Sequence, residues 1–231
     1  MGLQFTWLGH SAFQMHIDEH EVLFDPFLTG NPLASAHPDS LNPELIFLSH
    51  AHGDHLGDTV AIAQRTGCGV ISNAEISYWL KAHGVQHAHG QNTGGSADYD
   101  FLTCKLTIAF HSSSFPDGAY GGSPNGFIIT AKESGKRVYF AGDTALFSDM
   151  ALIGEERIDL AFIPIGDYFT MGIADSIRAI KYIQPRYVVP MHYNTFPLIA
   201  QSAVEWANRV SNETNAQPIV LDPGGSFIVR D

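Results

Sequence analysis

The sequence predicts a layered α/β fold that occupies the whole chain, residues 1–231, as one domain. Short apolar runs of β-strand length alternate with segments of helical spacing in both halves of the chain. Hydrophobic residues make up 45% of the sequence and charged residues 16%, which is enough apolar material to bury a sizeable core. No Pro/Ser-rich linker or block of charge divides the chain, so a single domain is expected.

The first part of the chain combines a meander of strands with a fully buried strand and two helices. Alternation of apolar and polar residues predicts three strands, and a near-continuous apolar run predicts a strand buried on both faces. Helical spacing with a glycine stop predicts each helix, with Asn73 as the N-cap of the second. The predicted strands cover 3–9, 12–18, 20–25 and 44–49, and the predicted helices cover 58–67 and 73–84.

The rest of the chain continues the strand series after a polar, glycine-rich stretch that carries no clear element. Two helices flank the last apolar strand of this series, and the chain is predicted to close with a β-hairpin over 218–231. The predicted strands cover 104–111, 123–131, 136–143, 158–167 and 186–192, and the predicted helices cover 173–184 and 199–211.

Composition argues against several classes of protein. The net charge of −12, from 24 acidic and 12 basic residues, disfavours a nucleic-acid partner, because phosphate binding needs a basic surface. No apolar run reaches the roughly 18 to 20 residues of a membrane helix, and no secretory signal opens the sequence. Two cysteines, Cys68 and Cys104, are too few for a disulfide framework. We expect a cytoplasmic protein with a small-molecule partner and no membrane partner, and a homo-oligomer stays open.

Four of the predicted strands end in a residue that can bind a metal ion. Loops at strand ends are where α/β proteins place their sites. The first of these residues also opens a run of six residues, "HAHGDH", that contains four candidate ligands. The candidate ligands are His50, His52, Asp54, His55, His111, Asp143 and His192.

These ligand types favour two divalent metal ions. Imidazole and carboxylate groups suit zinc, with manganese, iron and nickel as alternatives. His50 and His52 are two residues apart in an extended loop and can converge on one ion, while Asp54 and His55 can turn toward a second. Seven ligands exceed the need of one four-coordinate ion and suit two ions with open positions for water. Such a centre lowers the pKa of a bound water and presents hydroxide near neutral pH.

The run from His50 to His55 resembles the H-x-H-x-D-H signature of the metallo-β-lactamase superfamily, and His111, Asp143 and His192 follow in that family's order. The segments "WLGHSAF", "DPFLTGNP", "FAGDT" and "PMHYNTFP" are similar to one branch of it, the small stand-alone metal-dependent hydrolases, mostly of unknown substrate. The resemblance spans essentially the whole chain. It implies a four-layer αββα sandwich with the site at one edge between the sheets.

The resemblance also implies a role for each ligand. Hydroxide held between the two ions would attack a small ester, lactone, thioester or phosphodiester, and Asp54 would also hold or take the proton of that water. His50, His52 and His111 would bind the first ion, Asp54, His55 and His192 the second, and Asp143 would bridge the two.

Five further residues have two interpretations each. His10 is a candidate catalytic residue that reaches the metal pocket and contacts substrate or solvent, or it is a polar residue at a turn. Asp25 either accepts a hydrogen bond from a ligand imidazole or is a turn residue. Asp167, Tyr193 and Asn194 either line the pocket and orient the substrate or belong to turns.

Two other functions fit the same ligands: an iron-dependent oxidoreductase on the same scaffold, and a non-catalytic binding module stabilised by metal. The iron-based members that this chain resembles carry Glu where His52 stands, so His52 favours hydrolysis. Zinc β-lactamases typically carry Cys where Asp143 stands, so Asp143 argues against that activity. No glycine-rich loop for a phosphate-bearing cofactor is present.

Overall fold

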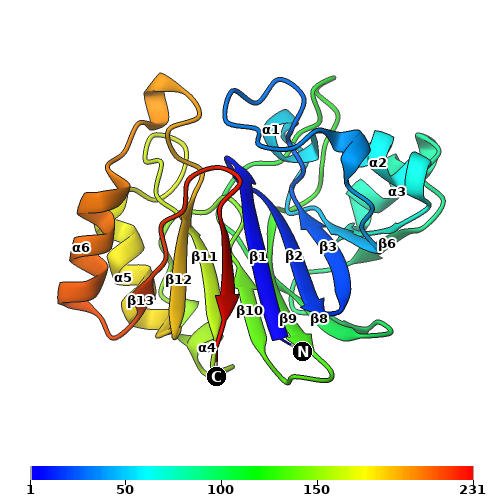
Figure 1. Cartoon of the computed structure of the whole chain (residues 1–231). Helices are drawn as coiled ribbons and strands as arrows, with labels where there is room; N and C mark the ends of the chain where they lie inside the picture. The colour runs from blue at the N-terminus through cyan, green and yellow to red at the C-terminus, as the bar shows by residue number, and fades with distance from the viewer. Residues whose placement is uncertain (1, 231) are drawn as a thin grey trace.

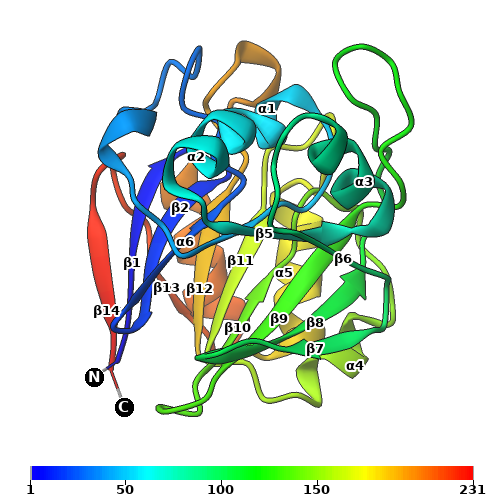
Figure 2. The same cartoon turned by 90° about the vertical axis from the view of Figure 1, so that its right-hand side faces the viewer.

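Two seven-stranded β-sheets packed face to face form the centre of the computed structural model, which describes residues 2–230 (Figure 1). Helices α2 (Thr59–Thr66) and α3 (Ala74–Ala82) cover the outer face of one sheet. Helices α5 (Ile173–Ile183) and α6 (Ala203–Glu213) cover the other, and in Figure 2 they lie behind the sheets while α2 and α3 lie in front. The layers follow the order helices, sheet, sheet, helices, which confirms the predicted αββα sandwich.

The N-terminal sheet combines an antiparallel half with a parallel half. In spatial order its strands are β14 (Ser226–Val229), β1 (Gly2–Gly9), β2 (Ala12–Asp18), β3 (His20–Phe24), β4 (Leu45–Phe47), β5 (Gly69–Asn73) and β6 (Ala88–Gln91). Strands β1 to β3 form the antiparallel meander that their alternating pattern predicts. The buried strand β4 then runs parallel to β3, so its carboxyl end lies beside that of β3.

The C-terminal sheet also combines an antiparallel half with a parallel half. In spatial order its strands are β13 (Gln217–Pro218), β12 (Tyr187–Met191), β11 (Leu160–Pro164), β10 (Arg137–Phe140), β9 (Asn125–Ala131), β8 (Leu102–Ile108) and β7 (Ser96–Asp98). Strands β7 to β10 are antiparallel neighbours, and β10 to β13 are parallel. The carboxyl ends of β10 and β12 therefore point to the same edge.

Aromatic side chains fill the space between the two sheets. Phe13 of β2 packs on Phe162 of β11 with ring centroids 4.5 Å apart, and Phe24 of β3 stacks on Phe140 of β10 at 4.8 Å. All four side chains are fully buried. Burial of one such side chain stabilises the fold by about 1.5–3 kcal/mol, so this layer holds the sheets in a fixed relative position.

The helices begin and end where their sequences predict, with small differences. The Asn73 side chain accepts a hydrogen bond from the backbone N–H of Ile76 at 2.8 Å and caps α3 as expected. The helix predicted over 199–211 begins at Ala203, because Ser202 is its N-cap. The short elements are α1 (Gly53–Leu56), α4 (Met150–Gly154) and the 3-10 turns Pro38–Ser40 and Pro197–Ile199.

The predicted hairpin over 218–231 is wrong within the described residues. Strand β13 pairs with β12 of the C-terminal sheet, whereas β14 pairs with β1 of the N-terminal sheet. Each strand satisfies the backbone groups at the open edge of a different sheet, so the two do not pair with each other. The turn between them is held by Trp7, which accepts from the N–H of Gly224 at 2.7 Å and donates to the carbonyl of Gly225 at 3.1 Å.

Two strands lie in the stretch for which the sequence predicted no element. Strands β6 and β7 are short, polar and largely exposed edge strands. Their backbones pair with a neighbour, but their side chains lack the apolar alternation on which the prediction depends. Among residues 2–230, no helix has the length and apolarity to cross a membrane.

Candidate metal centre

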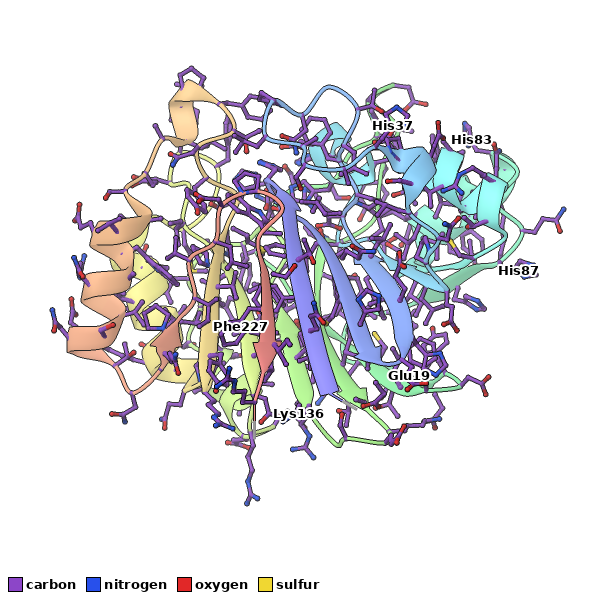
Figure 3. The ribbon with its side chains drawn as sticks, viewed as in Figure 1. Glu19, His37, His83, His87, Lys136 and Phe227 are labelled. Carbon is purple, nitrogen blue, oxygen red and sulfur yellow. The ribbon has the colours of Figure 1, made fainter. Side chains whose placement is uncertain are left out.

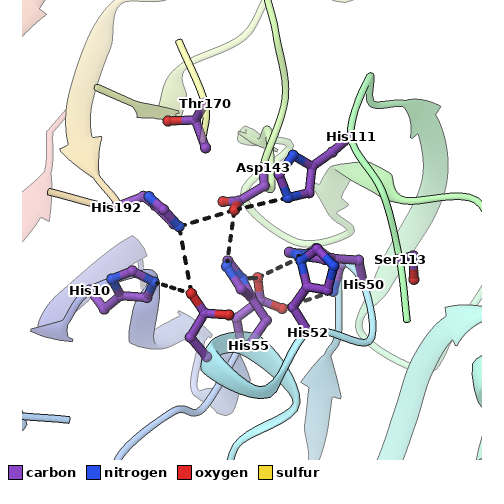
Figure 4. A network of polar contacts seen from close by, with 12 residues as sticks. His10, His50, His52, His55, His111, Ser113, Asp143, Thr170 and His192 are labelled. Atoms are coloured by element: carbon purple, nitrogen blue, oxygen red, sulfur yellow. Dashed lines mark hydrogen bonds and ion pairs between the residues drawn. The ribbon is translucent and has the colours of Figure 1, made fainter. Parts of the chain in front are cut away.

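The seven predicted ligands meet at one edge of the sandwich, in loops that follow β4, β8, β10 and β12 (Figure 4). His192 directly follows β12, while His50, His111 and Asp143 each stand three residues beyond the end of their strand. Because these strand ends point to one edge, side chains that are far apart in the sequence converge there. By contrast His37, His83 and His87 are exposed, and Figure 3 shows them at the periphery of the molecule.

Three histidines form the first cluster of the centre. Ring nitrogens of His50, His52 and His111 all lie within 4.8 Å of one another, and His50 Nε2 is 3.0 Å from His52 Nδ1. His50 is fully buried, whereas His52 and His111 are only partly buried. The cluster can therefore hold an ion and still face solvent on one side.

The second cluster combines a carboxylate with three imidazoles. Ligand atoms of Asp54, His55, His192 and His10 lie within 4.8 Å of one another. Asp54 Oδ2 is 3.8 Å from His192 Nε2 and 3.3 Å from His10 Nε2. The three imidazoles are at most 2% exposed, while the Asp54 side chain is 32% exposed and is the part of this cluster that meets solvent.

Asp143 lies between the two clusters. Its Oδ2 atom is 3.0 Å from His192 Nε2, 3.3 Å from His55 Nε2 and 3.6 Å from His111 Nε2. One carboxylate oxygen thus contacts imidazoles of both clusters, and Asp143 is only 2% exposed. This is the position that a bridging carboxylate requires.

Asp25 orients two imidazoles of the centre. Its Oδ2 atom accepts from His55 Nδ1 at 2.7 Å and from the Ser49 hydroxyl at 2.6 Å. Because that hydroxyl donates to Asp25, its oxygen accepts from His50 Nδ1, 3.0 Å away. Both rings then present the lone pair of Nε2 to the centre, as a metal ligand must. Of the two interpretations of Asp25, the structure supports the hydrogen-bond acceptor.

Replacing Asp25 with asparagine should lower the affinity of the centre for zinc about 10- to 100-fold, the usual effect of losing a hydrogen-bond partner behind a metal ligand. Asparagine keeps the shape but removes the charge that fixes His55. Competition with a chromophoric chelator measures the affinity. Asp100→Asn is the matched control, because Asp100 is exposed in the turn between β7 and β8, at the opposite end of β8 from His111. Equal affinities in both variants would contradict the orienting role.

The glycine that ends α1 lets the ligand-bearing run pack against the loop after β3. Gly57 has φ +40°, and a Cβ atom there would lie 2.4 Å from the carbonyl oxygen of Pro26 and 2.5 Å from Cα of Phe27. Both contacts are to backbone, which cannot move aside cheaply. Close approach of the two segments places Asp25 beside His55.

Carboxylates and imidazoles balance one another's charge in the centre. Burial alone would lower the pKa of His192, but Asp143 raises it to about 9. Burial likewise opposes a charge on His55, yet Asp143 and Asp25 raise its pKa well above the ordinary value. The same two imidazoles hold the pKa of Asp143 well below its usual range in spite of burial. For His50, burial followed by the charge of His55 outweighs the effect of Asp143 and lowers the pKa.

Metal uptake should therefore release protons at neutral pH. His55 and His192 are protonated in the metal-free protein below their raised pKa values, and an ion can bind only their neutral forms. Metal affinity should therefore rise with pH through the neutral range, because fewer protons have to leave His55 and His192. Zinc titration in weakly buffered solution with a pH indicator measures the released protons. Affinity that does not change between pH 6 and pH 8 would contradict this charge balance.

The remaining candidates separate into pocket and turn residues. His10 reaches the centre, and burial followed by the neighbouring His192 lowers its pKa to about 4. Tyr193 stacks on Trp7 at 5.3 Å, and Asn194 accepts from the N–H of Gln201 at 2.8 Å, so both support turns.

Asp167 is an exposed turn residue whose carbonyl accepts from the N–H of Thr170 at 2.9 Å. Two residues that contact the imidazoles escaped the sequence analysis: Ser49 beside His50, and Thr195, 2.8 Å from His10 Nδ1. A hydroxyl gives no signal in the sequence that it will face an imidazole.

The donor set fits divalent metal ions. Imidazole nitrogens and carboxylate oxygens are their common ligands, and neighbouring ligands of a tetrahedral ion with bonds of 2.0–2.2 Å lie about 3.3–3.6 Å apart. The contacts of Asp143 span 3.0 to 3.6 Å. Two buried ring nitrogens that face the other ligands lack a hydrogen-bond partner among residues 2–230, a rare condition that a bound ion would relieve. They are His10 Nε2 and His55 Nε2.

Comparison with known proteins agrees with this geometry. The family described as "Beta-lactamase superfamily domain" matches residues 4–192. A "UPF0173 metal-dependent hydrolase" of Methanosarcina mazei is 44% identical over 229 residues, 97% of this chain and 98% of the relative. A relative of the same description from Thermus thermophilus is 45% identical over 222 residues, 96% and 97% of the two chains. The solved structure of Igni18, a metallo hydrolase of Ignicoccus hospitalis, superposes with a TM-score of 0.91 at 38% identity over 99% of both chains.

Proposed function

Because the chain belongs to the β-lactamase superfamily and is a metal-dependent hydrolase like its UPF0173 relatives, we propose that it hydrolyses a small ester, lactone, thioester or phosphodiester with two divalent ions. The observation that carries the proposal is the position of Asp143, whose Oδ2 atom contacts His111 of one cluster and both His55 and His192 of the other. A carboxylate in that position fits two adjacent ions rather than one.

Each ion would have its own set of ligands, and zinc suits these donors best, with manganese, iron and nickel as alternatives. A pair of such ions lowers the pKa of a bound water and so supplies hydroxide near neutral pH. His50, His52 and His111 would hold the first ion, Asp54, His55 and His192 the second, and Asp143 both.

The carboxylates of Asp143 and Asp54 would balance charge and orient the attacking water. Asp143 keeps its negative charge, since His192 and His55 stabilise the carboxylate, and it offsets the charge of the ions. Asp54 also stays anionic, because His192 and the nearby charge of His55 hold the pKa of its carboxyl well below the usual range in spite of burial. Its partly exposed carboxylate can accept a hydrogen bond from the attacking water and so orient it.

Substrate would approach from the side of His52, Asp54 and His111, which are the partly exposed groups of the centre. The other imidazoles are buried and exclude water from the far side. The protein's net charge of −12 disfavours a polyanionic substrate such as nucleic acid, which supports a small molecule.

Elemental analysis of the purified protein, metal by metal, followed by a panel of esters, lactones, thioesters and phosphodiesters, tests the proposal. We expect close to two ions per chain and hydrolysis that a chelator abolishes and zinc or manganese restores. His52→Ala should lose the activity, whereas His37→Ala, which alters an exposed histidine outside the centre, should keep it. One ion per chain would contradict the dinuclear centre. Iron with oxygen consumption and no hydrolysis would favour the oxidoreductase instead.

A further inference from the structure

His10 lies inside the centre, although the resemblance to the superfamily gives it no place among the seven ligands. We infer that His10 is a further protein ligand of the ion held by Asp54, His55 and His192. This inference rests on the proposed function and changes the role predicted for His10, because a ring nitrogen that binds the ion cannot also contact the substrate.

The position of the His10 ring carries the first part of the inference. The side chain is fully buried, and its Nε2 atom lies 3.3 Å from Asp54 Oδ2. Figure 4 shows the His10 ring at the centre, beside His192. That distance equals the spacing of about 3.3 Å between neighbouring ligands of a tetrahedral ion with bonds near 2.0 Å. The ring centroids of His10 and His192 are 4.2 Å apart. His10 is thus as close to this cluster as the residues already assigned to it.

The hydrogen bond behind the ring fixes which nitrogen is free. His10 Nδ1 is 2.8 Å from the hydroxyl oxygen of Thr195, and that hydroxyl donates to the carbonyl of Tyr193 at 3.4 Å. The oxygen therefore accepts from Nδ1–H of His10. A partner behind the ring that takes this proton is the usual support of a metal-bound histidine.

The same tautomer leaves a lone pair on Nε2 that points at the Asp54 carboxylate. Among residues 2–230 this atom has no hydrogen-bond partner, so the 3.3 Å contact is not a hydrogen bond by its geometry. A nitrogen lone pair facing a carboxylate oxygen is repulsive unless a proton or a metal ion lies between them, and this contact lacks the geometry of a hydrogen bond. A metal ion bound by both groups removes the repulsion and satisfies both.

The backbone conformation of His10 directs its ring toward Asp54 and His192. Its φ is +57°, a left-handed conformation that costs a residue with a side chain about 1 kcal/mol or more. Two donors stabilise it, since the carbonyl of His10 accepts from Trp7 Nε1 at 3.0 Å and from the N–H of His192 at 3.2 Å. The loop after β1 is therefore tied directly to the loop after β12.

The extra ligand makes the two ions unequal. The ion beside His10 would have more protein ligands, as in sites that serve structure, whereas the ion of the first cluster would keep an open position, as catalytic sites do. Around the ion beside His10 only Asp54 is partly exposed, since His10, His55 and His192 are at most 2% exposed, whereas His52 and His111 of the first cluster are both partly exposed. The first cluster would then be the one that meets the substrate.

Titration of the metal-free full-length protein with cobalt chloride, followed by calorimetry and visible absorption, tests the inference. Wild type should bind two ions. His10→Ala and His10→Gln should weaken one binding event more than about 100-fold, beyond the 10- to 100-fold effect of an orienting residue, and leave the other unchanged. Thr195→Val, which removes only the support behind the ring, should weaken the same event by about tenfold.

Proton NMR of the cobalt-loaded protein gives a readout that an orienting role would not change. Each histidine bound to cobalt contributes a strongly shifted exchangeable imidazole N–H signal, so His10→Gln should lack one signal that Thr195→Val retains. Wild-type affinity and an unchanged set of signals in His10→Gln would overturn the inference while two bound ions still supported the proposed function. Fewer than two ions in wild type would overturn the proposed function itself.

Discussion

Replacing Asp143 with asparagine should abolish hydrolysis and lower metal affinity by roughly two to four orders of magnitude. Removing one partner of a buried charge pair costs about 3–5 kcal/mol, and 1.36 kcal/mol corresponds to a factor of ten. Asp143 is buried and its Oδ2 atom lies within 3.6 Å of His55, His111 and His192, so no other carboxylate can take its place between the clusters. Asparagine keeps the volume of the side chain and removes only the charge.

Zinc content by elemental analysis, chelator competition and hydrolysis of any active substrate measure this effect. The matched control is Asp149→Asn, since Asp149 is an exposed residue six positions further along the chain. Circular dichroism confirms that each variant folds. An Asp143→Asn protein with full metal content and unreduced activity would show that the two clusters need no bridging carboxylate.

Replacing Gly57 with alanine should lower the free energy of unfolding by about 2–6 kcal/mol, the sum of backbone strain and overpacking. The glycine has φ +40°, and the new methyl group would lie 2.4 Å from the carbonyl oxygen of Pro26. Relief of this clash must move α1 away from the loop after β3. That movement also separates His55 from Asp25, so metal affinity should fall together with stability.

Urea unfolding of the metal-free variants separates the two contributions to this loss. Gly67→Ala is the matched control, because Gly67 has φ +73° and an added Cβ atom would have no neighbour within 4 Å in the described structure. It should cost only the strain of a left-handed alanine, about 1–2 kcal/mol. Equal losses in the two variants would show that the contact of Gly57 with Pro26 relaxes without cost.

The spacing of apolar residues and the helix-capping residues predicted most of the strands and helices, because these elements form where their own sequence favours them. The continuous apolar run around Ile46 became the buried strand β4, and Asn73 caps α3 through its own side chain. The pairing of β14 with β1 could not be predicted in this way. It joins residues near opposite ends of the chain, and nothing in the segment 218–230 tells which sheet edge is open.

For the candidate site, the sequence predicted which strand ends carry the ligands but not which other residues contact them. Strand-end positions brought His50, His111, Asp143 and His192 to one edge, because parallel strands place their carboxyl ends together. The sequence left open whether Asp25 or His10 reaches that edge. Their contacts depend on how closely two loops approach each other, and such distances are fixed by tertiary packing.

The candidate ligands come from both sheets: the run from His50 to His55 follows a strand of the N-terminal sheet, whereas His111, Asp143 and His192 follow strands of the C-terminal sheet. Ions bound by ligands from both sheets would link the two sheets at this edge of the sandwich. An ion present at a hundred times its dissociation constant adds about 2.7 kcal/mol to the folded state. Proteases that attack transiently opened chains should therefore degrade the metal-starved protein faster, and metal supply would set its lifetime as well as its activity.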